Sequence, residues 1–196
     1  MLAVELLQLV GRIQAQSLMM TSMPDKTCMD GLSIIENQTR RGATLVSDLA
    51  QIYKTRTVLL APCGIEDLIV EMLNLRKIFL EEYKVETECR VQPGLMVTAE
   101  YNRLSRVFDN LLVNACHAMK SSGHGKLIIE SETAGMKVKI HFRDTGTGID
   151  DKTLEKIFIP FFTTKGAMAI DHQGIPGNGL GLAVSYALVK SFGGEL

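Results

Sequence analysis

The sequence predicts an α+β fold preceded by an α-helical hairpin. Residues 1–55 carry apolar side chains at helical spacing and show no strand pattern. Residues 56–196 mix helical patterns with stretches in which apolar and polar side chains alternate, as they do in strands. Residues 145–180 are rich in Gly, Thr and Pro, which predicts a long and mostly irregular segment inside the second part.

The first 55 residues contain two predicted helices, at residues 2–22 and 26–54, separated by Pro24, which cannot continue a helix. In the second helix apolar or small residues recur in alternating steps of three and four, which is a heptad seam. Two antiparallel helices with such seams do not cover each other fully, so we expect a homodimer built as a four-helix bundle. The alternative is that both helices pack on the globular domain of their own chain.

The sequence of residues 56–196 predicts a series of short helices and strands. One face of the strand at residues 85–91, with Val85, Thr87, Cys89 and Val91, is expected to be half-buried. In chain order the patterns predict a strand at 58–60, a helix at 62–82, the strand at 85–91, a helix at 101–120, a hairpin of strands 126–133 and 136–143, a short helix at 151–157 and a final helix at 181–192.

Composition narrows the function classes. Hydrophobic residues make up 46% and charged residues 22% of 196 residues, which is ordinary for a soluble globular protein. The net charge of −1 supplies no strong field, so neither nucleic acid nor an anionic membrane is expected as the main partner. The four cysteines form no CxxC pair and are expected to be free, buried thiols in a reducing cytosol. No apolar run is long enough for a membrane helix, so no membrane contact is expected from this segment, although a longer parent protein could be anchored.

A predicted helix carries the most informative string, DNLLVNA at residues 109–115. Asn110, Asn114 and His117 stand at i, i+4 and i+7 and therefore share one helix face. Two amides on a face flanked by Leu and Val are unusual unless a polar group lies over them. A magnesium–triphosphate is such a group, because an amide oxygen is a hard ligand that suits Mg²⁺. The alternative is two solvent-facing amides on an amphipathic helix.

Two glycine-bearing strings follow. Asp144 ends a predicted strand, where its carboxylate can accept from an adenine amine, and Gly146 and Gly148 let the backbone pass close to the base. An Asp-x-Gly string after a strand is also a common turn signal. The second string, GNGLGL at residues 177–182, leads directly into a helix, and glycine amides at a helix N-terminus form an anion site. It is neither a P-loop nor a dinucleotide-binding fingerprint.

Residues 163–176 predict a lid, since loops of this length are usually functional. Phe161 and Phe162 are expected to anchor the lid through apolar packing, and Thr163, Thr164 and Lys165 to reach phosphate.

These strings, in this order, resemble the N, G1, F and G2 boxes of the ATP-binding domain shared by sensor histidine kinases, gyrase, MutL and the large heat-shock chaperones. The details look most like a two-component sensor histidine kinase. The resemblance covers residues 57–196 by motif and residues 1–54 only by helix pattern. It implies an α/β sandwich ATP-binding (Bergerat) domain, with ATP and Mg²⁺ as ligands and a response-regulator receiver domain as partner.

The resemblance also implies residue roles. It assigns the metal contact to Asn114, a catalytic and water-orienting place to Asn110, and adenine selection to Asp144. His117 stands where many of these kinases have Lys or Asp, so it either touches phosphate or ribose or faces solvent. The expected nucleotide-binding set is Asn110, Asn114, His117, Asp144, Gly146, Gly148, Ile149, Phe162, Thr163, Thr164, Lys165, Gly177, Asn178, Gly179, Leu180, Gly181 and Leu182.

The implied activity is transfer of the ATP γ-phosphate to a histidine and then to a response regulator. None of the four histidines lies in the first 54 residues, so the acceptor is expected upstream of residue 1 and this fragment is expected not to autophosphorylate. The alternative is a divergent, catalytically silent module that binds nucleotide or docks a phosphotransfer partner. Hydrolysis of the gyrase type is disfavoured, because the Glu that would act as base is replaced by Asn110.

Overall fold

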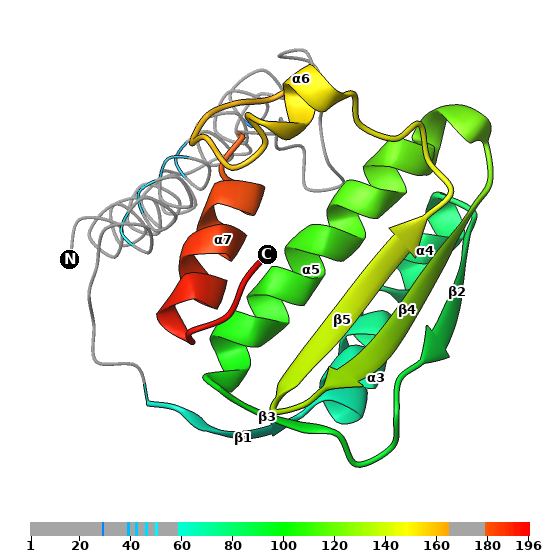
Figure 1. The fold of residues 1–196 in the computed structure, drawn as a ribbon. Coiled ribbons are helices and arrows are strands. Elements are labelled where there is room, and N and C mark those ends of the chain that lie inside the picture. The colour runs from blue at the N-terminus through cyan, green and yellow to red at the C-terminus, as the bar shows by residue number, and fades with distance from the viewer. Residues whose placement is uncertain are drawn as a thin grey trace, which may run out of the picture. The chain divides into compact units, whose positions relative to one another are not determined.

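The computed structural model describes residues 59–164 and 179–196, together with five single helical positions between residues 29 and 50. The chain divides into two compact units, residues 1–54 with 161–180 and residues 55–160 with 181–196. The second unit contains the described sheets and helices (Figure 1). Most of the predicted helical hairpin lies outside the described residues, so the hairpin, its dimer and the boundary at residue 55 stay predictions.

A three-stranded sheet forms one layer of the second unit. Its order is β2 (Val85–Arg90), β4 (Gly125–Ala134) and β5 (Lys137–Asp144), with β2 parallel to β4 and β4 antiparallel to β5. The β4–β5 hairpin turns through Gly135, whose φ of +62° suits glycine. The strand at 85–91 and the hairpin predicted around residues 134–135 are thereby confirmed.

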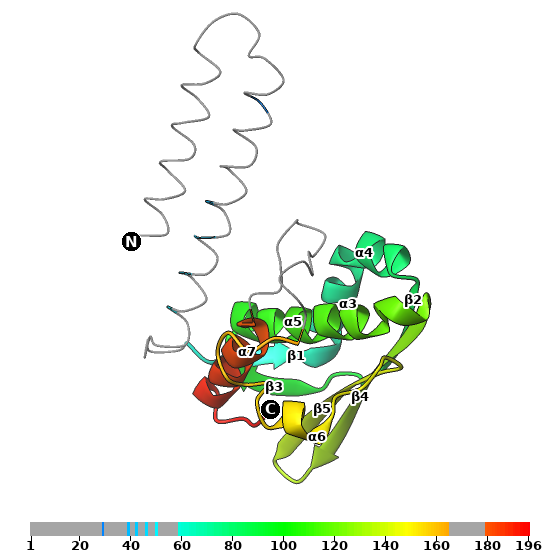
Figure 2. The same ribbon diagram turned by 90° about the horizontal axis from the view of Figure 1, so that it is seen from above.

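Helices cover one face of this sheet (Figure 2). The helix α5 (Tyr101–Met119) contacts β4 and β5, and it also contacts α3 (Ile65–Leu75) and α7 (Gly181–Ser191). A helix of six residues, α4 (Lys77–Glu82), follows α3 and packs on β2. The helix α5 continues into a single 3₁₀ turn, η1 (Lys120–Ser122). The short α6 (Asp151–Leu154) follows the loop after β5. This layering of helices on a mixed sheet confirms the predicted α+β class.

The core lies between α5 and the sheet. Phe108 of α5 packs on Phe142 of β5 with ring centroids 5.3 Å apart. Apolar residues spaced along one side of α5 meet the inward side chains of β4, which explains why so polar a helix is stable in this position. The fully buried residues of these elements are Val107, Leu112, Cys116, Met119, Leu127 and Ile129.

The first strand lies three residues later than predicted. The strand β1 is Ala61–Gly64 and pairs antiparallel with β3 (Met96–Ala99), a strand that we did not predict. Leu59 and Leu60 precede β1 and are 83% and 46% exposed. Because Pro62 to Gly64 belong to β1, the predicted helix at 62–82 begins only at Ile65, and it is divided at Arg76. Pairing between segments distant in sequence outweighed the local pattern here.

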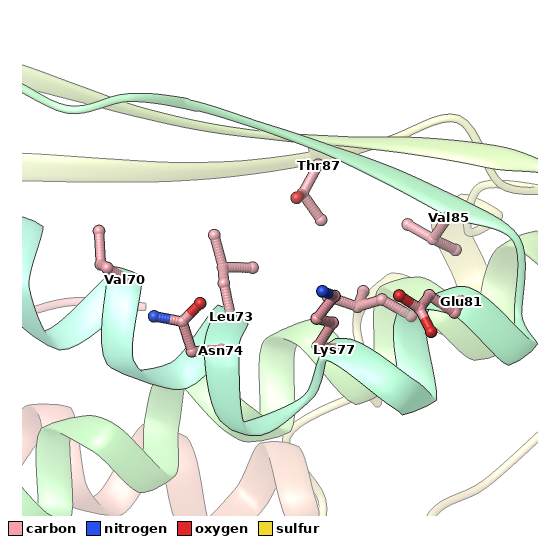
Figure 3. Close-up of a pocket in the computed structure, with 8 residues that line it drawn as sticks. Val70, Leu73, Asn74, Lys77, Glu81, Val85 and Thr87 are labelled. Atoms are coloured by element: carbon pink, nitrogen blue, oxygen red, sulfur yellow. The ribbon is translucent and has the colours of Figure 1, made fainter.

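The predicted half-buried face of β2 is only partly buried. Val85 and Val91 are buried, whereas Thr87 and Cys89 are exposed. Thr87 is exposed because α3 and α4 leave a groove of about 380 Å³ beside this edge strand, and Thr87 faces the groove (Figure 3). The groove is lined by Val70, Leu73, Asn74, Lys77, Leu80, Glu81, Val85 and Thr87.

Candidate functional site

The helix α5 presents the predicted polar face. Asn110, Asn114 and His117 share this face, as their spacing requires, and all three are half-buried. The Nδ2 atom of Asn110 donates to the carbonyl oxygen of Gly181 and to Oγ of Ser185, both at 3.0 Å. The side-chain amide of Asn110 therefore joins the middle of α5 to the first turn of α7, where the second glycine string ends.

His117 packs against the aromatic residues at the end of α4. Its ring centroid lies 5.7 Å from that of Tyr83 and 6.5 Å from that of Phe79, and these two rings are themselves 4.7 Å apart. The ammonium of Lys120 lies 5.8 Å above the Tyr83 ring. The imidazole is thus supported from one side by the aromatic rings of Phe79 and Tyr83, and His117 remains partly exposed. Whether it contacts phosphate or ribose stays a prediction.

The loop after β5 holds Asp144 at its start. One carboxylate oxygen of Asp144 accepts from the backbone N–H of Gly146 at 2.9 Å, and the side chain is exposed. This hydrogen bond shapes the turn and confirms the turn signal that the sequence contained. The carboxylate has two oxygens and several acceptor sites, so this hydrogen bond leaves part of its acceptor capacity unused.

The two glycines of this loop serve different structural needs. A Cβ on Gly146 would lie 2.7 Å from the carbonyl carbon and the Cβ of Ala118, so only glycine lets the loop approach the end of α5. The neighbouring Thr147 N–H donates to the carbonyl of Ala118 at 3.3 Å. Gly148 has open space where a Cβ would lie, but its φ is +71°. Gly146 is thus needed for a close approach to protein, and Gly148 for its backbone conformation.

Two further contacts hold the same loop. The hydroxyl of Thr145 accepts from the backbone N–H of Lys126 at 3.0 Å, and the backbone N–H of Thr145 donates to the carbonyl of Lys126 at 3.2 Å. Farther along, Asp150 caps α6 by accepting from the N–H of Thr153 at 3.0 Å, and this hydrogen bond lowers the pKa of the Asp150 carboxyl. Ile149, which lies between Gly148 and Asp150 in the sequence, has an apolar side chain that is 53% exposed.

The segment that contains Phe158 and Phe161 is held by a ring contact at Phe158 and by a backbone contact at Phe161. Within the second unit the ring of Phe158 packs on Tyr186 of α7 with centroids 5.0 Å apart. Within the first unit the backbone N–H of Phe161 donates to the carbonyl of Gly179 at 3.0 Å. A Cβ on Gly179 would lie 2.6 Å from the carbonyl carbon of Phe161, and the φ of Gly179 is +65°. Phe161 and Gly179 therefore meet through backbone contacts.

The expectation that Phe161 anchors the lid by apolar packing is wrong. Its side chain is 58% exposed, and its φ is +68°, which is rare for a residue with a side chain. The anchoring comes from its backbone hydrogen bond to Gly179. Phe162 is half-buried, and Thr163 and Thr164 are exposed.

The predicted site residues fall into three groups. Asn110, Asn114, His117, Asp144, Gly146, Gly148, Ile149, Gly181 and Leu182 belong to the second unit. Phe162, Thr163, Thr164, Gly179 and Leu180 belong to the first unit. Lys165, Gly177 and Asn178 lie outside the described residues.

Sequence reasoning missed Ser185, the second acceptor for Asn110. Ser185 is fully buried and is the one buried polar side chain among the described residues. Its only signal in the sequence is a hydroxyl at i+4 from Gly181, on a helix whose other inward residues are apolar.

The remaining polar chemistry is modest. The three cysteines that the structure describes, Cys63, Cys89 and Cys116, are free thiols as predicted. Cys63 and Cys116 are buried, and burial raises the pKa of Cys116 to about 12. The predicted burial is wrong for Cys89, which is exposed on the edge strand β2. In the described part of the chain no group of three or more His, Cys, Asp or Glu residues is placed to hold a metal ion. Of the helices that the structure describes, none has the length and apolar character needed to cross a membrane.

The two amides on one face of α5, and the hydrogen bonds from Asn110 to the first turn of α7, agree with the expected ATP-binding domain of the histidine kinase and gyrase type. Residues 99–196 match the family described as "Histidine kinase-, DNA gyrase B-, and HSP90-like ATPase", and the chain belongs to this family. Within the family it is an ATP-binding catalytic region of the two-component sensor histidine kinase type.

Individual relatives agree with this assignment. The sensor histidine kinase ZraS of Salmonella typhi is 34% identical over 160 residues, which cover 78% of this chain and 31% of ZraS. The catalytic domain of histidine kinase ThkA is 29% identical with a TM-score of 0.56, covering 67% of this chain and 81% of that one. A structure of ThkA with the response regulator protein TrrA is 25% identical with a TM-score of 0.57, covering 90% and 53%. The chain thus spans about a third of the length of ZraS.

Proposed function

We propose that this chain binds ATP with Mg²⁺ over the polar face of α5 and positions the γ-phosphate for transfer to a histidine outside residues 1–196. The observation that carries the proposal is the hydrogen-bonded link between Asn110 and the first turn of α7. This link brings a face with two amides against the N-terminus of an 11-residue helix. The backbone N–H groups at such an N-terminus favour phosphate oxygens.

The residues on α5 suit a magnesium–phosphate group. Mg²⁺ takes oxygen ligands, keeps several waters and accepts few protein ligands, so one amide oxygen from Asn114 is a reasonable contribution. The bound ion would neutralise phosphate charge. Asp144, exposed at the end of β5, has an oxygen to accept from the adenine amine, and this gives selection for the base. In this scheme the domain orients groups and balances charge rather than forming a covalent bond.

The proposed relay continues to a response-regulator receiver domain. The support is the ThkA complex, whose second protein is a response regulator and whose fold this chain shares over most of its length. We further propose that residues 1–55 form the dimer and that the domain works in the cytoplasm. The second candidate, a silent docking module, has less support because the amide face and the α7 link are both formed.

Calorimetric titration with a non-hydrolysable ATP analogue, with and without Mg²⁺, tests the nucleotide site. We expect binding that Mg²⁺ strengthens, and we expect Asn114→Ala to remove that strengthening while the domain stays folded. Asn102→Ala is the matched control, because Asn102 is an exposed amide near the start of the same helix. Absence of binding by the unaltered chain in both conditions would overturn the proposal and favour the docking module.

A phosphorylation assay tests the position of the acceptor. With labelled ATP we expect no acid-labile phosphate on this chain and labelling of a histidine in a longer form that extends upstream. Label on any of the four histidines of residues 1–196 contradicts this part of the proposal. Light scattering of the same sample tests the dimer, and a monomer at micromolar concentration argues against it.

A further inference from the structure

The contacts of Asn110 determine which way round its side-chain amide lies. Gly181 offers a backbone carbonyl, which can only accept, so the atom 3.0 Å from it must be the amide nitrogen. Reversal of the amide would place two acceptors against each other. The orientation therefore follows from the chemistry of the partner and not from a choice between two similar shapes.

Both hydrogens of this amide are committed to α7. One goes to the Gly181 carbonyl and the other to Ser185 Oγ, which also lies 3.0 Å from Nδ2. The group that Asn110 can offer a ligand is consequently its Oδ1 atom, which only accepts. An acceptor can hold a water of a magnesium shell but is repelled by a phosphate oxygen.

We infer that Ser185 is a positioning residue for magnesium-dependent nucleotide binding. Ser185 holds the side-chain amide of Asn110 in the orientation that leaves Oδ1 of Asn110 available to a ligand. The inference rests on the proposed function. Ser185 stands one helical turn after Gly181, so its hydroxyl and that carbonyl lie together on the side of α7 that meets α5. Ser185 is completely buried, so its hydroxyl is not free to turn toward solvent and is held beside Asn110.

Gly181 alone holds the amide less well than Gly181 and Ser185 together. With one hydrogen bond the amide can swing about its terminal torsion, which is broad for an asparagine. The second bond removes that freedom and leaves Oδ1 in one place. A purely structural role would differ: Ser185 would then only attach α7 to α5, and its loss would lower stability without changing how Mg²⁺ affects nucleotide affinity.

The experiment compares Ser185→Ala with the unaltered chain by calorimetric titration of a non-hydrolysable ATP analogue, with and without Mg²⁺. We expect affinity without Mg²⁺ to change by less than about twofold. We expect the Mg²⁺-dependent increase in affinity to shrink by about three- to tenfold, the range that one net hydrogen bond supplies. Ser185→Thr keeps the hydroxyl and should preserve the increase. Ser191→Ala is the control, since its hydroxyl on the same helix bonds Leu188 and not Asn110.

The outcomes separate the inference from the proposed function. If the unaltered chain does not bind nucleotide, the proposed function fails. If it binds and Ser185→Ala keeps the full Mg²⁺ effect, or loses it together with Ser191→Ala, the role of Ser185 is refuted. Ser185→Cys is a second variant, which nearly keeps the size of the side chain but offers sulfur, a weak acceptor, so it should reduce the Mg²⁺ effect even if Ser185→Ala proves unstable.

Discussion

Arg76 and Asp109 form a bidentate ion pair that joins the α3–α4 junction to α5. Nε lies 2.6 Å from Oδ1 and Nη2 lies 2.6 Å from Oδ2, with each side chain about a third exposed. The guanidinium also lies 5.8 Å above the Phe79 ring. Two parallel hydrogen bonds fix an angle as well as a distance, so this pair orients the start of α4, and through Phe79 it orients the aromatic support of His117.

Arg76→Lys is expected to lower the free energy of unfolding by about 1 kcal/mol, because an ammonium cannot reproduce the planar two-bond contact. Urea denaturation measures this change. Arg143→Lys is the matched control, since Arg143 bonds Glu130 at 3.0 Å but is 63% exposed, and its loss should be roughly 0–0.5 kcal/mol. Equal losses at the two positions would show that the bidentate geometry adds nothing.

Gly146 and Gly148 are expected to respond differently to asparagine. Gly146→Ala should destabilise by about 1–3 kcal/mol through its clash with Ala118, and Gly146→Asn should be no better because the larger side chain meets the same atoms. Gly148→Ala should cost about 1 kcal/mol for its positive φ, and Gly148→Asn less, because asparagine tolerates that conformation. Chemical denaturation of the four variants checks this, and a rescue by asparagine at Gly146 would contradict the close approach.

Alanine substitutions at Gly181 and Gly179 are expected to differ in their effects: the first should lower nucleotide affinity and the second should lower stability. A Cβ on Gly181 would lie 3.7 Å from the nearest atoms of Asn110, an ordinary contact, so Gly181→Ala should leave stability unchanged or raise it by up to about 1 kcal/mol. Nucleotide affinity should fall, because a methyl group would occupy space beside the N-terminus of α7. Gly179→Ala should instead disturb the backbone contact with Phe161. Thermal melting and nucleotide titration of both variants measure the two effects, and a large loss of stability in Gly181→Ala would count against this division.

Local patterns were sufficient for the elements whose contacts are local or strongly periodic. The apolar side of α5 and the β4–β5 hairpin both appear where residues 101–120 and 126–143 predicted them. The strand β3 was missed because its four residues carry no clear alternation, and its existence depends on pairing with β1 across about thirty residues of chain. The prediction that Thr87 lies on a half-buried face failed for a similar reason, because the coverage of β2 depends on where α3 and α4 lie.

The candidate site divides in the same way. Helical periodicity placed Asn110, Asn114 and His117 on one face without knowledge of the fold. Nothing local could show that the amide hydrogens of Asn110 are used by α7, because Ser185 is 75 residues away. The role of Gly146 was likewise assigned to a ligand, whereas its nearest neighbour is the backbone of Ala118. Contacts between elements, rather than residue types, decide these roles.

The charged side chains on the open face of the sheet give a prediction about pH. Glu88 accepts from Arg90 Nε at 2.6 Å and lies 2.7 Å from Lys126 Nζ, and these partners, Arg90 first, lower its pKa from 4.5 to about 2. A carboxyl with a lowered pKa in the folded state stabilises the fold above pH 4.5, and this contribution disappears as the pH falls toward 2. Because about a third of the Glu88 side chain is exposed to solvent, we expect the contribution to stability to be small and screened by salt.

Carbon-detected NMR titration of the Glu88 carboxyl at low salt should therefore give a midpoint near 2. Arg90→Gln should raise that midpoint more than Lys126→Gln, because the hydrogen bond from Arg90 is the larger cause of the shift. Salt at about 1 M should raise it as well, since the Debye length then falls to about 3 Å. A midpoint at the ordinary 4.5 in the unaltered chain at low salt would mean that the three side chains do not hold this arrangement in solution. The parallel pairing of β2 with β4 places Glu88 and Lys126 within reach of each other, so that result would also call the register of this strand pair into question.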